Sequence, residues 1–290
     1  MAALNASRGM NSSGQGFWDC LDAVLVINLD HRTDRWHDLR SHLAGVVPEG
    51  KLHRVPAVLG RALPGYETSR WFRRTRRAST WGGRAGCLLS HRNALRLARE
   101  RGWRRILILE DDARIALPLG GDTGRELAAF LENNGRVYGA LFLGFTTPKK
   151  PVRRLLDLKD GPAVFQVGGC STTHAYVVDA SLYEPLLARF PSEDAQVWAW
   201  LARHVAIDRW YSLHLDRLTR VAALSPQAII QGASLSDITG RAADYHEEAS
   251  ADSLSPLESA PAAAVVYRMA RRMGGVTRTL KGWLRLVRGL

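Results

Sequence analysis

One segment, residues 106–112, constrains the fold and chemistry of this chain more than any other. Four apolar residues, 106–109, run directly into Glu110, Asp111 and Asp112. A short apolar run of this kind is typical of a buried strand of a parallel sheet, which brings the residues after it to the carboxyl edge, where ligands bind. Three adjacent carboxylates repel one another unless a positive charge lies among them, and Mg²⁺ and Mn²⁺ prefer oxygen ligands. The segment predicts a divalent-cation site; a solvated acidic loop is the alternative.

Strand-like and helix-like patterns alternate along most of the chain. The expected strands are residues 23–29, 51–58, 106–109, 137–143 and 174–178, and the expected helices are residues 33–43, 84–100, 126–133 and 180–189. This alternation predicts an α/β fold with a mostly parallel sheet flanked by helices. Residues 71–81, rich in arginine with a tryptophan at each end, have no period. We expect them to form a loop, either a lid or acceptor wall suited to an acidic glycan, or a solvated basic loop.

The composition indicates an ordinary globular chain with two basic regions. Its 290 residues are 46% hydrophobic and 23% charged, which is enough for a large core. The formal net charge is +12, but seven basic residues and no acid follow residue 258, and twelve arginines lie between residues 70 and 105. Neither region interleaves aromatic residues as an RNA-binding sheet does, and no helix-turn-helix or zinc-finger spacing is present. We therefore expect no nucleic-acid partner.

Cysteine usage and hydropathy favour a cytoplasmic location. Cys20, Cys87 and Cys170 are odd in number and widely spaced, which argues against a disulfide framework or a cysteine-type zinc site. Residues 1–17 lack the apolar core of a signal peptide, and no stretch reaches the roughly 18 apolar residues of a membrane span. The P-loop, the Gly-x-Gly-x-x-Gly loop, the Gly-x-Ser-x-Gly elbow and the His-Glu-x-x-His motif are also missing. This disfavours the kinase, dehydrogenase, hydrolase and zincin classes.

Five blocks of the sequence resemble, in order and approximate spacing, the motifs of glycosyltransferase family 25, which includes lipopolysaccharide β-galactosyltransferases and collagen galactosyltransferases. They are residues 24–35 (VLVINLDHRTDR), 86–91 (GCLLSH), 107–112 (LILEDD), 173–178 (THAYVV), and 207–208 together with Gln231 and 236–238. The resemblance covers roughly residues 24–238. It departs at Gly139, where the family usually carries an aspartate.

The resemblance implies a GT-A fold and inverting transfer of a sugar, most often galactose, from a nucleotide diphosphate sugar. Asp112, with Asp111, would hold Mn²⁺ or Mg²⁺, which neutralises the leaving diphosphate. Glu110 would contact the ribose or fix the loop. Inversion needs a general base for the acceptor hydroxyl, and Asp208 is the candidate. The alternative for Asp208 is a helix cap or a salt bridge with Arg209.

Other residues in the matched blocks are candidates for the donor pocket. Asn28, Arg32 and Arg35 follow the first strand and would hold uridine and phosphate. Alternatively, the two arginines are surface residues beside a helix cap. His91 lines the donor cleft or is a satisfied core histidine.

The last matched block supplies two more candidates. Gln231 and Asp237 would close the nucleotide pocket, although Asp237 suits a turn equally well. His246 is a further candidate metal ligand, although it falls in the expected linker.

Apolar residues in the C-terminal region recur at helical spacing. They are Val266, Met269, Met273, Val276, Leu280, Trp283, Val287 and Leu290. The seven basic residues fill other positions with no acid among them, which fits an interfacial helix on an anionic membrane better than a coiled coil. A helix docked on the catalytic domain or forming a dimer is the alternative. We expect a disordered N-terminus (1–20), a single catalytic domain (21–240), a linker (241–264) and a basic amphipathic helix (265–290).

Together these features predict a cytoplasmic inverting glycosyltransferase, peripheral on the inner face of the membrane. Its donor would be UDP-galactose, and its acceptor a surface glycan or glycolipid such as lipopolysaccharide or lipooligosaccharide. One alternative keeps the fold and uses another donor, such as UDP-glucose. Another is a catalytically inactive GT-A module that binds glycans or partner proteins; the intact acidic triplet argues against it.

Overall fold

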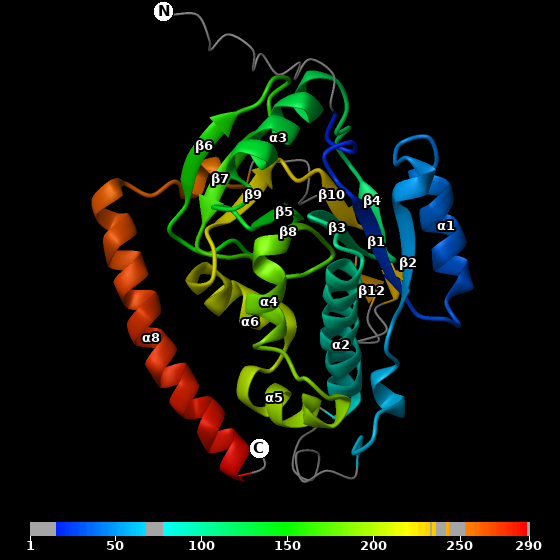
Figure 1. The fold of residues 1–290 in the computed structure, drawn as a ribbon. Helices are drawn as coiled ribbons and strands as arrows, with labels where there is room; N and C mark the ends of the chain where they lie inside the picture. Colours follow the sequence, from blue (N-terminus) through cyan, green and yellow to red (C-terminus); the bar gives the residue numbers. More distant parts are fainter. Residues whose placement is uncertain (1–15, 68–77, 233, 236–241, 244–252, 289–290) are drawn as a thin grey trace, which may run out of the picture.

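The computed structural model describes residues 16–67, 78–232, 234–235, 242–243 and 253–288. Its centre is an eight-stranded sheet (Figure 1). In spatial order the strands are β2 (Leu52–Pro56), β1 (Ala23–Asn28), β3 (Arg105–Glu110), β8 (Ala175–Asp179), β5 (Ala140–Gly144), β9 (Val221–Ser225), β7 (Ala163–Val167) and β6 (Arg153–Asp157). Only β8 and β7 run against the others, so six of the eight strands point the same way.

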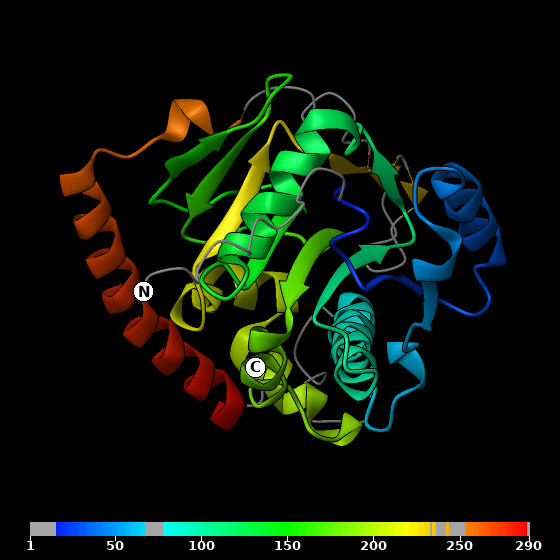
Figure 2. The ribbon, with the colours of Figure 1, turned by 45° about the horizontal axis from the view of Figure 1, so that its top comes forward.

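Helices cover both faces of this sheet. They are α1 (Thr33–Leu43), α2 (Ala78–Glu100), α3 (Gly121–Asn134), α4 (Tyr183–Leu187), α5 (Val197–His204) and α6 (Ile207–His214). A further helix, α8 (Pro261–Arg288), packs against α5. In β1, Leu25 packs in the core with α2, α4, α5 and α6, whereas Val26 packs in the core with α1 and α3. A strand buried on both faces is apolar throughout, which explains the unbroken apolar runs in the sequence. Figure 2 shows α3 and α2 separated by the sheet.

The predicted fold class is confirmed: an α/β domain with a mostly parallel sheet flanked by helices, followed by a C-terminal helix. The helix expected at 33–43 has those bounds, but α2 begins at Ala78, so the end of the stretch expected to be a loop is helical. Helix α3 begins at Gly121, five residues earlier than expected, and α4 is confined to Tyr183–Leu187. The sequence patterns do not predict β6, β7, β9, α5 or α6.

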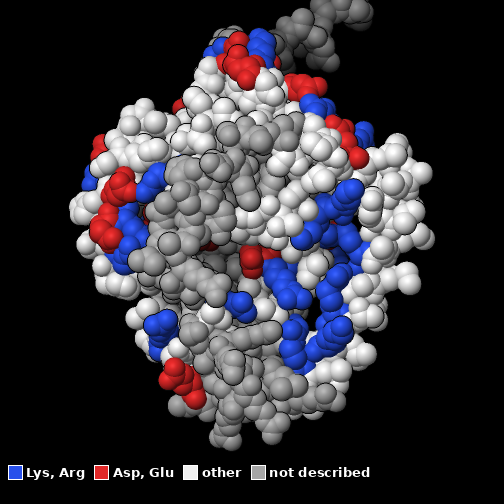
Figure 3. Space-filling model, turned by 180° about the vertical axis from the view of Figure 1, so that it is seen from behind, with Lys and Arg blue, Asp and Glu red and all other residues white. Residues whose placement is uncertain are grey.

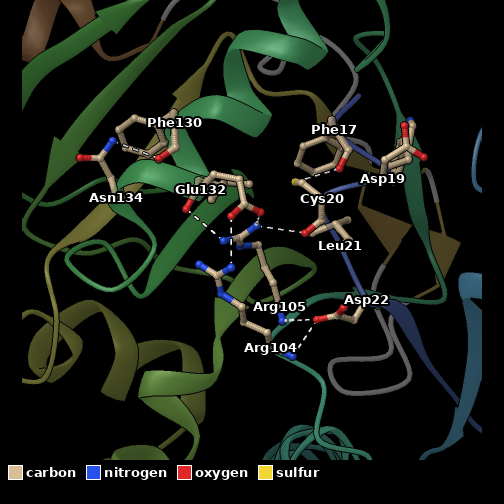
Figure 4. Close-up of polar contacts among 12 residues, drawn as sticks. Phe17, Asp19, Cys20, Leu21, Asp22, Arg104, Arg105, Phe130, Glu132 and Asn134 are labelled. Carbon is tan, nitrogen blue, oxygen red and sulfur yellow. Dashed lines mark hydrogen bonds and ion pairs between the residues drawn. The ribbon is translucent and has the colours of Figure 1, made fainter. Parts of the chain in front are cut away.

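The N-terminal end of β3 is anchored by a buried arginine (Figure 4). The Arg105 side chain is only 1% exposed, and its guanidinium donates to Glu132 Oε1 (2.6 Å), to the Cys20 carbonyl (3.0 Å) and to the Leu131 carbonyl (3.0 Å). Asp22 accepts hydrogen bonds from the backbone N–H groups at Arg104 and Arg105 (2.7 and 2.8 Å). These charge-assisted bonds fix β3 at one end, so its acidic other end has a defined position.

Both segments expected to lack structure are partly folded. Phe17, inside the expected disordered N-terminus, is fully buried in the core beside α3, and Cys20 is 7% exposed. Leu254, inside the expected linker, is also fully buried, and α8 begins at Pro261 rather than at residue 265. The α/β domain therefore includes apolar anchors on either side of the range that the sequence pattern indicated.

Helix α8 runs along one side of the molecule, on the opposite edge from α1 (Figures 1 and 2). It contacts α5, and its Arg271 forms an ion pair with Asp216 (3.1 Å) and donates to the Ser212 carbonyl (3.1 Å). Most of the predicted apolar series is exposed: Val266, Met269, Met273, Val276, Leu280, Trp283 and Val287 are all at least half exposed. Trp283, the least exposed of them, also contacts Arg203 of α5. The helix is thus docked through other positions, among them Arg271, Gly282 and Leu286, while most of its apolar series lies in solvent.

Candidate functional site

The acidic triplet lies at the carboxyl ends of two neighbouring parallel strands. The register pairs Ile27 of β1 with Glu110 of β3, so Asn28 lies beside the triplet. Asn28 Nδ2 donates to Asp111 Oδ2 (2.8 Å), and Arg35 Nη1 donates to Asp111 Oδ1 (2.9 Å). The side chains of this ion pair are 12% and 11% exposed. Both carboxylate oxygens of Asp111 are therefore held by the protein, which fixes the direction of the chain as it enters Asp112.

Asp112 has a different environment from Asp111. Desolvation, together with the charges of Glu110 and Asp111, raises the pKa of the Asp112 carboxyl to about 7, although Arg35 and Gln231 act in the opposite direction. Gln231 Nε2 donates to Asp112 Oδ2 at 3.5 Å, the outer limit of a hydrogen bond. A divalent cation would remove the electrostatic penalty of ionising Asp112 among other acids. The donor set, which is all oxygen at this point, fits Mg²⁺ or Mn²⁺.

Glu110 faces α2 and the loop before β8. Its Oε1 accepts from Thr173 Oγ1 (2.8 Å) and lies 3.4 Å from His91 Nε2. Cys87, one helical turn before His91, completes a group whose potential ligand atoms lie within 4.8 Å of one another. These three residue types can also hold a metal, so Glu110, Cys87 and His91 form a group of potential metal ligands two residues before Asp112 in the chain.

His91 is fully buried, as a core histidine would be, yet it faces the site. Its Nδ1 is 2.9 Å from the hydroxyl of Tyr176, which lies 3.4 Å from the hydroxyl of Tyr211 in α6. Desolvation raises the pKa of both tyrosines, so their hydroxyl groups keep their protons at neutral pH. A polar chain inside the apolar core therefore connects Glu110 to the helix that carries Asp208.

Asp208 lies in the first turn of α6 and is half-buried. The negative charge of its carboxylate acts on the Cys87 thiol. Desolvation is the largest cause of the raised pKa of that thiol, followed by the charges of Glu110, Asp208 and Asp112. The Cys87 thiol of α2 is thus influenced by the charges of three carboxylates, two at the end of β3 and one on α6. From behind, Figure 3 shows acidic side chains in a hollow near the middle of the face, with lysine and arginine side chains beside them. The arrangement suits a cation and an anionic ligand together.

The structure brings together most, but not all, of the predicted site residues. Those that meet around the end of β3 are Asn28, Arg35, His91, Glu110, Asp111, Asp112 and Gln231. Asp208 lies on α6, where its charge acts on the Cys87 thiol. Arg32 forms a two-bond ion pair with Asp34 (3.0 and 2.9 Å), which lowers the pKa of the Asp34 carboxyl to about 2. Asp237 and His246 lie outside the described residues.

Two further residues of the site were not predicted. Cys87 and Thr173 both contact or flank Glu110. The signal for Cys87 was its spacing of four from His91, which places both side chains on one helical face. Thr173 begins one of the matched blocks, but nothing in its local pattern distinguishes it from a loop threonine. Asn28 also has contacts that the sequence did not predict: its side-chain oxygen accepts from Arg54 Nε (2.8 Å), and its side-chain amide donates to Asp111 Oδ2 (2.8 Å).

Comparison with known proteins gives no family assignment. No protein-family model matches the chain, and no curated protein matches it. Among solved structures, the chain is similar to the crystal structure of mannose-1-phosphate geranyltransferase from Thermus thermophilus, with a TM-score of 0.34 and 13% sequence identity. The similarity covers 76% of this chain and 74% of that one. The roles of the site residues therefore depend on the geometry of this chain.

Proposed function

We propose that the chain is a metal-dependent inverting glycosyltransferase of the family 25 type, with a UDP-sugar as donor. The observation that carries the proposal is Asp112, an acid with a pKa raised to about 7 beside two other carboxylates at the end of a buried strand. Such a group favours a divalent cation, and a cation there would neutralise the charge that develops on a departing diphosphate. Galactose is the proposed sugar, and glucose is the alternative.

The residues of the chain have distinct proposed roles. Asp112 is the main cation ligand, and Asp111, fixed by Asn28 and Arg35, is the second. Glu110 contacts the donor, and Arg35 and Gln231 are proposed to contact its nucleotide part. Asp208 takes the proton of the acceptor hydroxyl. It lies on α6, whereas Asp112 follows β3, so the proposed base and the proposed cation ligand come from different elements.

Nucleotide-sugar binding can be tested by thermal unfolding. We expect UDP-galactose with Mn²⁺ to stabilise the protein by about 2.7 kcal/mol when the ligand is at a hundredfold its Kd, and to have little effect in EDTA. UDP-glucose, run in parallel, reports the donor preference. GDP-mannose, which carries guanine in place of uracil, is the control for recognition of the nucleotide base. Equal stabilisation in EDTA would contradict metal-dependent binding. Metal-dependent binding without hydrolysis of the UDP-sugar would instead support the inactive glycan-binding module.

We also propose that α8 holds the enzyme on an anionic membrane surface, at the inner face, beside a glycolipid acceptor such as a lipopolysaccharide precursor. The support is the exposed apolar series of α8, from Val266 to Val287, together with its basic residues. An apolar face flanked by basic residues is typical of helices that lie in the membrane interface. Within the described part of the chain, no helix has the length and apolar character needed to span a bilayer.

The membrane proposal predicts a position-specific loss of vesicle binding. Val266→Glu combined with Val276→Glu should weaken binding to anionic vesicles by at least about 30-fold, because two acids replace exposed apolar groups and each charge at such a surface changes binding by about 1 kcal/mol. The matched control is Val46→Glu with Val137→Glu, which makes the same change at exposed valines elsewhere. Cosedimentation measures both. Equal binding by the two double variants would exclude α8 as the anchor.

A further inference from the structure

A cavity of about 170 Å³ lies between α5, α6 and the docked face of α8. A single water molecule needs only about 10–15 Å³ by the same kind of measure, so the cavity has room for a larger polar group. Its basic lining residues are Arg203 of α5, Arg209 of α6, and Arg278, Lys281 and Arg285 of α8. The proposed transfer reaction uses none of them.

The electrostatic environment of this cavity is positive. None of the described residues that line it is acidic. Desolvation, and then the neighbouring cationic residues, lower the pKa of His204 to about 3 and that of His214 to about 4. Desolvation and the charges of neighbouring arginines also lower the pKa of Arg278. Cationic groups this close repel one another, and an anion bound among them would remove that repulsion.

The hydrogen-bonding groups of the cavity match a phosphate. Within the described structure, Nε of Arg203 and Nε of Arg278 are buried and have no hydrogen-bond partner. Arg278 is held in place by a hydrogen bond from its Nη2 to the Arg271 carbonyl (3.3 Å). The Arg203 guanidinium lies over the Trp283 ring, 5.7 Å from its centroid. Planar guanidinium groups with free N–H donors bind phosphate oxygens in pairs, so two fixed arginines make a suitable site.

The exposed apolar face of α8 indicates where such a phosphate would come from. Trp283 lines the cavity and is also half exposed, and its neighbours Leu280 and Leu284 are 63% and 44% exposed. A group seated in the cavity therefore lies next to apolar surface on the same helix. Figure 3 shows lysine and arginine side chains gathered between the central hollow and the side of the molecule where α8 lies.

We propose that this cavity binds the phosphate-ester headgroup of a membrane lipid, whose apolar chains lie along the exposed face of α8. The inference rests on the proposed membrane-facing role of α8 and adds a specific headgroup site to it. Nonspecific attraction between a basic helix and an anionic surface depends on the number of charges, whereas a site depends on which residues carry them. That difference makes the proposal testable.

The test compares two double variants of α8 that remove the same charge. Arg278→Gln with Lys281→Gln removes two cavity residues, whereas Arg268→Gln with Arg272→Gln removes two exposed residues outside the cavity. Binding to phosphatidylcholine vesicles that contain phosphatidic acid is measured in EDTA, without nucleotide sugar. We expect the cavity pair to bind at least about tenfold more weakly than the exposed pair, because lost charge-assisted hydrogen bonds add to the lost surface attraction.

Three outcomes would overturn the proposal. Equal loss in the two pairs would mean that charge number alone matters. Loss of inorganic phosphate affinity in the cavity pair, with vesicle binding equal to that of the exposed pair, would identify a soluble phosphate rather than a lipid as the ligand. No binding of either probe by the wild type would mean that the cavity is not an anion site.

Two controls keep this test separate from the proposed function. Equal melting temperatures exclude misfolding, and Lys281→Gln alone replaces the pair if that pair is unstable. UDP-sugar hydrolysis, measured without vesicles, should be the same in both pairs and the wild type. Its absence from the wild type would count against the transferase but not against the headgroup site.

Discussion

Replacing Asp112 by asparagine is expected to lower metal-dependent turnover by at least about 10²-fold while leaving the fold intact. Changes to residues that only support a metal ligand typically lower affinity or activity by about 10–100-fold, so loss of the ligand itself should reach or exceed that range. An amide also holds a hard divalent cation far more weakly than a carboxylate does. Steady-state turnover of the UDP-sugar over a range of Mn²⁺ concentrations measures the effect. The control is Asp30→Asn, an exposed acid at the same sheet edge that pairs with Arg54.

The same variant should be as stable as the wild type or more stable. The pKa of Asp112 is raised to about 7 in the fold, whereas that of an unfolded aspartate is about 3.9. Between these pH values the folded protein holds a proton that the unfolded chain releases, so this group lowers stability as pH rises through that window. Urea unfolding in EDTA should show a larger advantage for Asp112→Asn at pH 8 than at pH 5. For the turnover prediction, unchanged turnover in Asp112→Asn, or activity of the wild type in EDTA, would exclude Asp112 as a cation ligand.

The sequence predicts the centre of this site because the signal there is local. Residues 106–112 contain both the apolar run that makes β3 a buried strand and the acids that follow it. Contacts between residues that are far apart in the sequence cannot be predicted from a local pattern. Asp112 meets Gln231, 119 positions away, because β10 (Ile229–Gln231) pairs with β4 (Ala113–Ile115). No periodicity reveals such a pairing, and only the resemblance pointed to Gln231.

Local patterns also do not predict the role of a residue when the same residue type can serve either a surface ion pair or the site. Arg32 and Arg35 both follow β1, but Arg32 pairs with Asp34 two positions away and Arg35 reaches Asp111. Cys87 lies on the apolar face of α2, where a cysteine is indistinguishable from a small core residue by sequence.

The short helices α5 and α6 are hard to detect from the sequence for another reason. Each has eight residues, and Val205 between them has a positive φ of 77°, which sequence rarely indicates for a valine.

Replacing Asp208 by asparagine is expected to lower kcat by about 10² to 10⁴, the usual contribution of general acid–base catalysis. The structure separates the two alternatives for this residue. Among the described residues no ion pair joins Asp208 to the Arg209 side chain, and Ala206 holds the N-cap position of α6. Asp208 Oδ1 accepts from the Arg209 backbone N–H (2.6 Å), one of the first-turn N–H groups that lack a partner within the helix, so Asp208 does satisfy a group at the helix start.

Separate measurements of binding and turnover distinguish a base from a ligand. If Asp208 is the base, Asp208→Asn should keep its affinity for UDP and Mn²⁺, because a proton acceptor acts on the acceptor hydroxyl and not on the nucleotide. Asp122→Asn is the matched control, since Asp122 also lies in the first turn of a helix and tests the loss of an acid at a helix N-terminus. A simultaneous loss of UDP affinity and turnover in Asp208→Asn would instead place Asp208 among the residues that shape the site or hold the cation. The proton would then have to leave through another group, and Glu110, which already accepts from Thr173, would be the next residue to test.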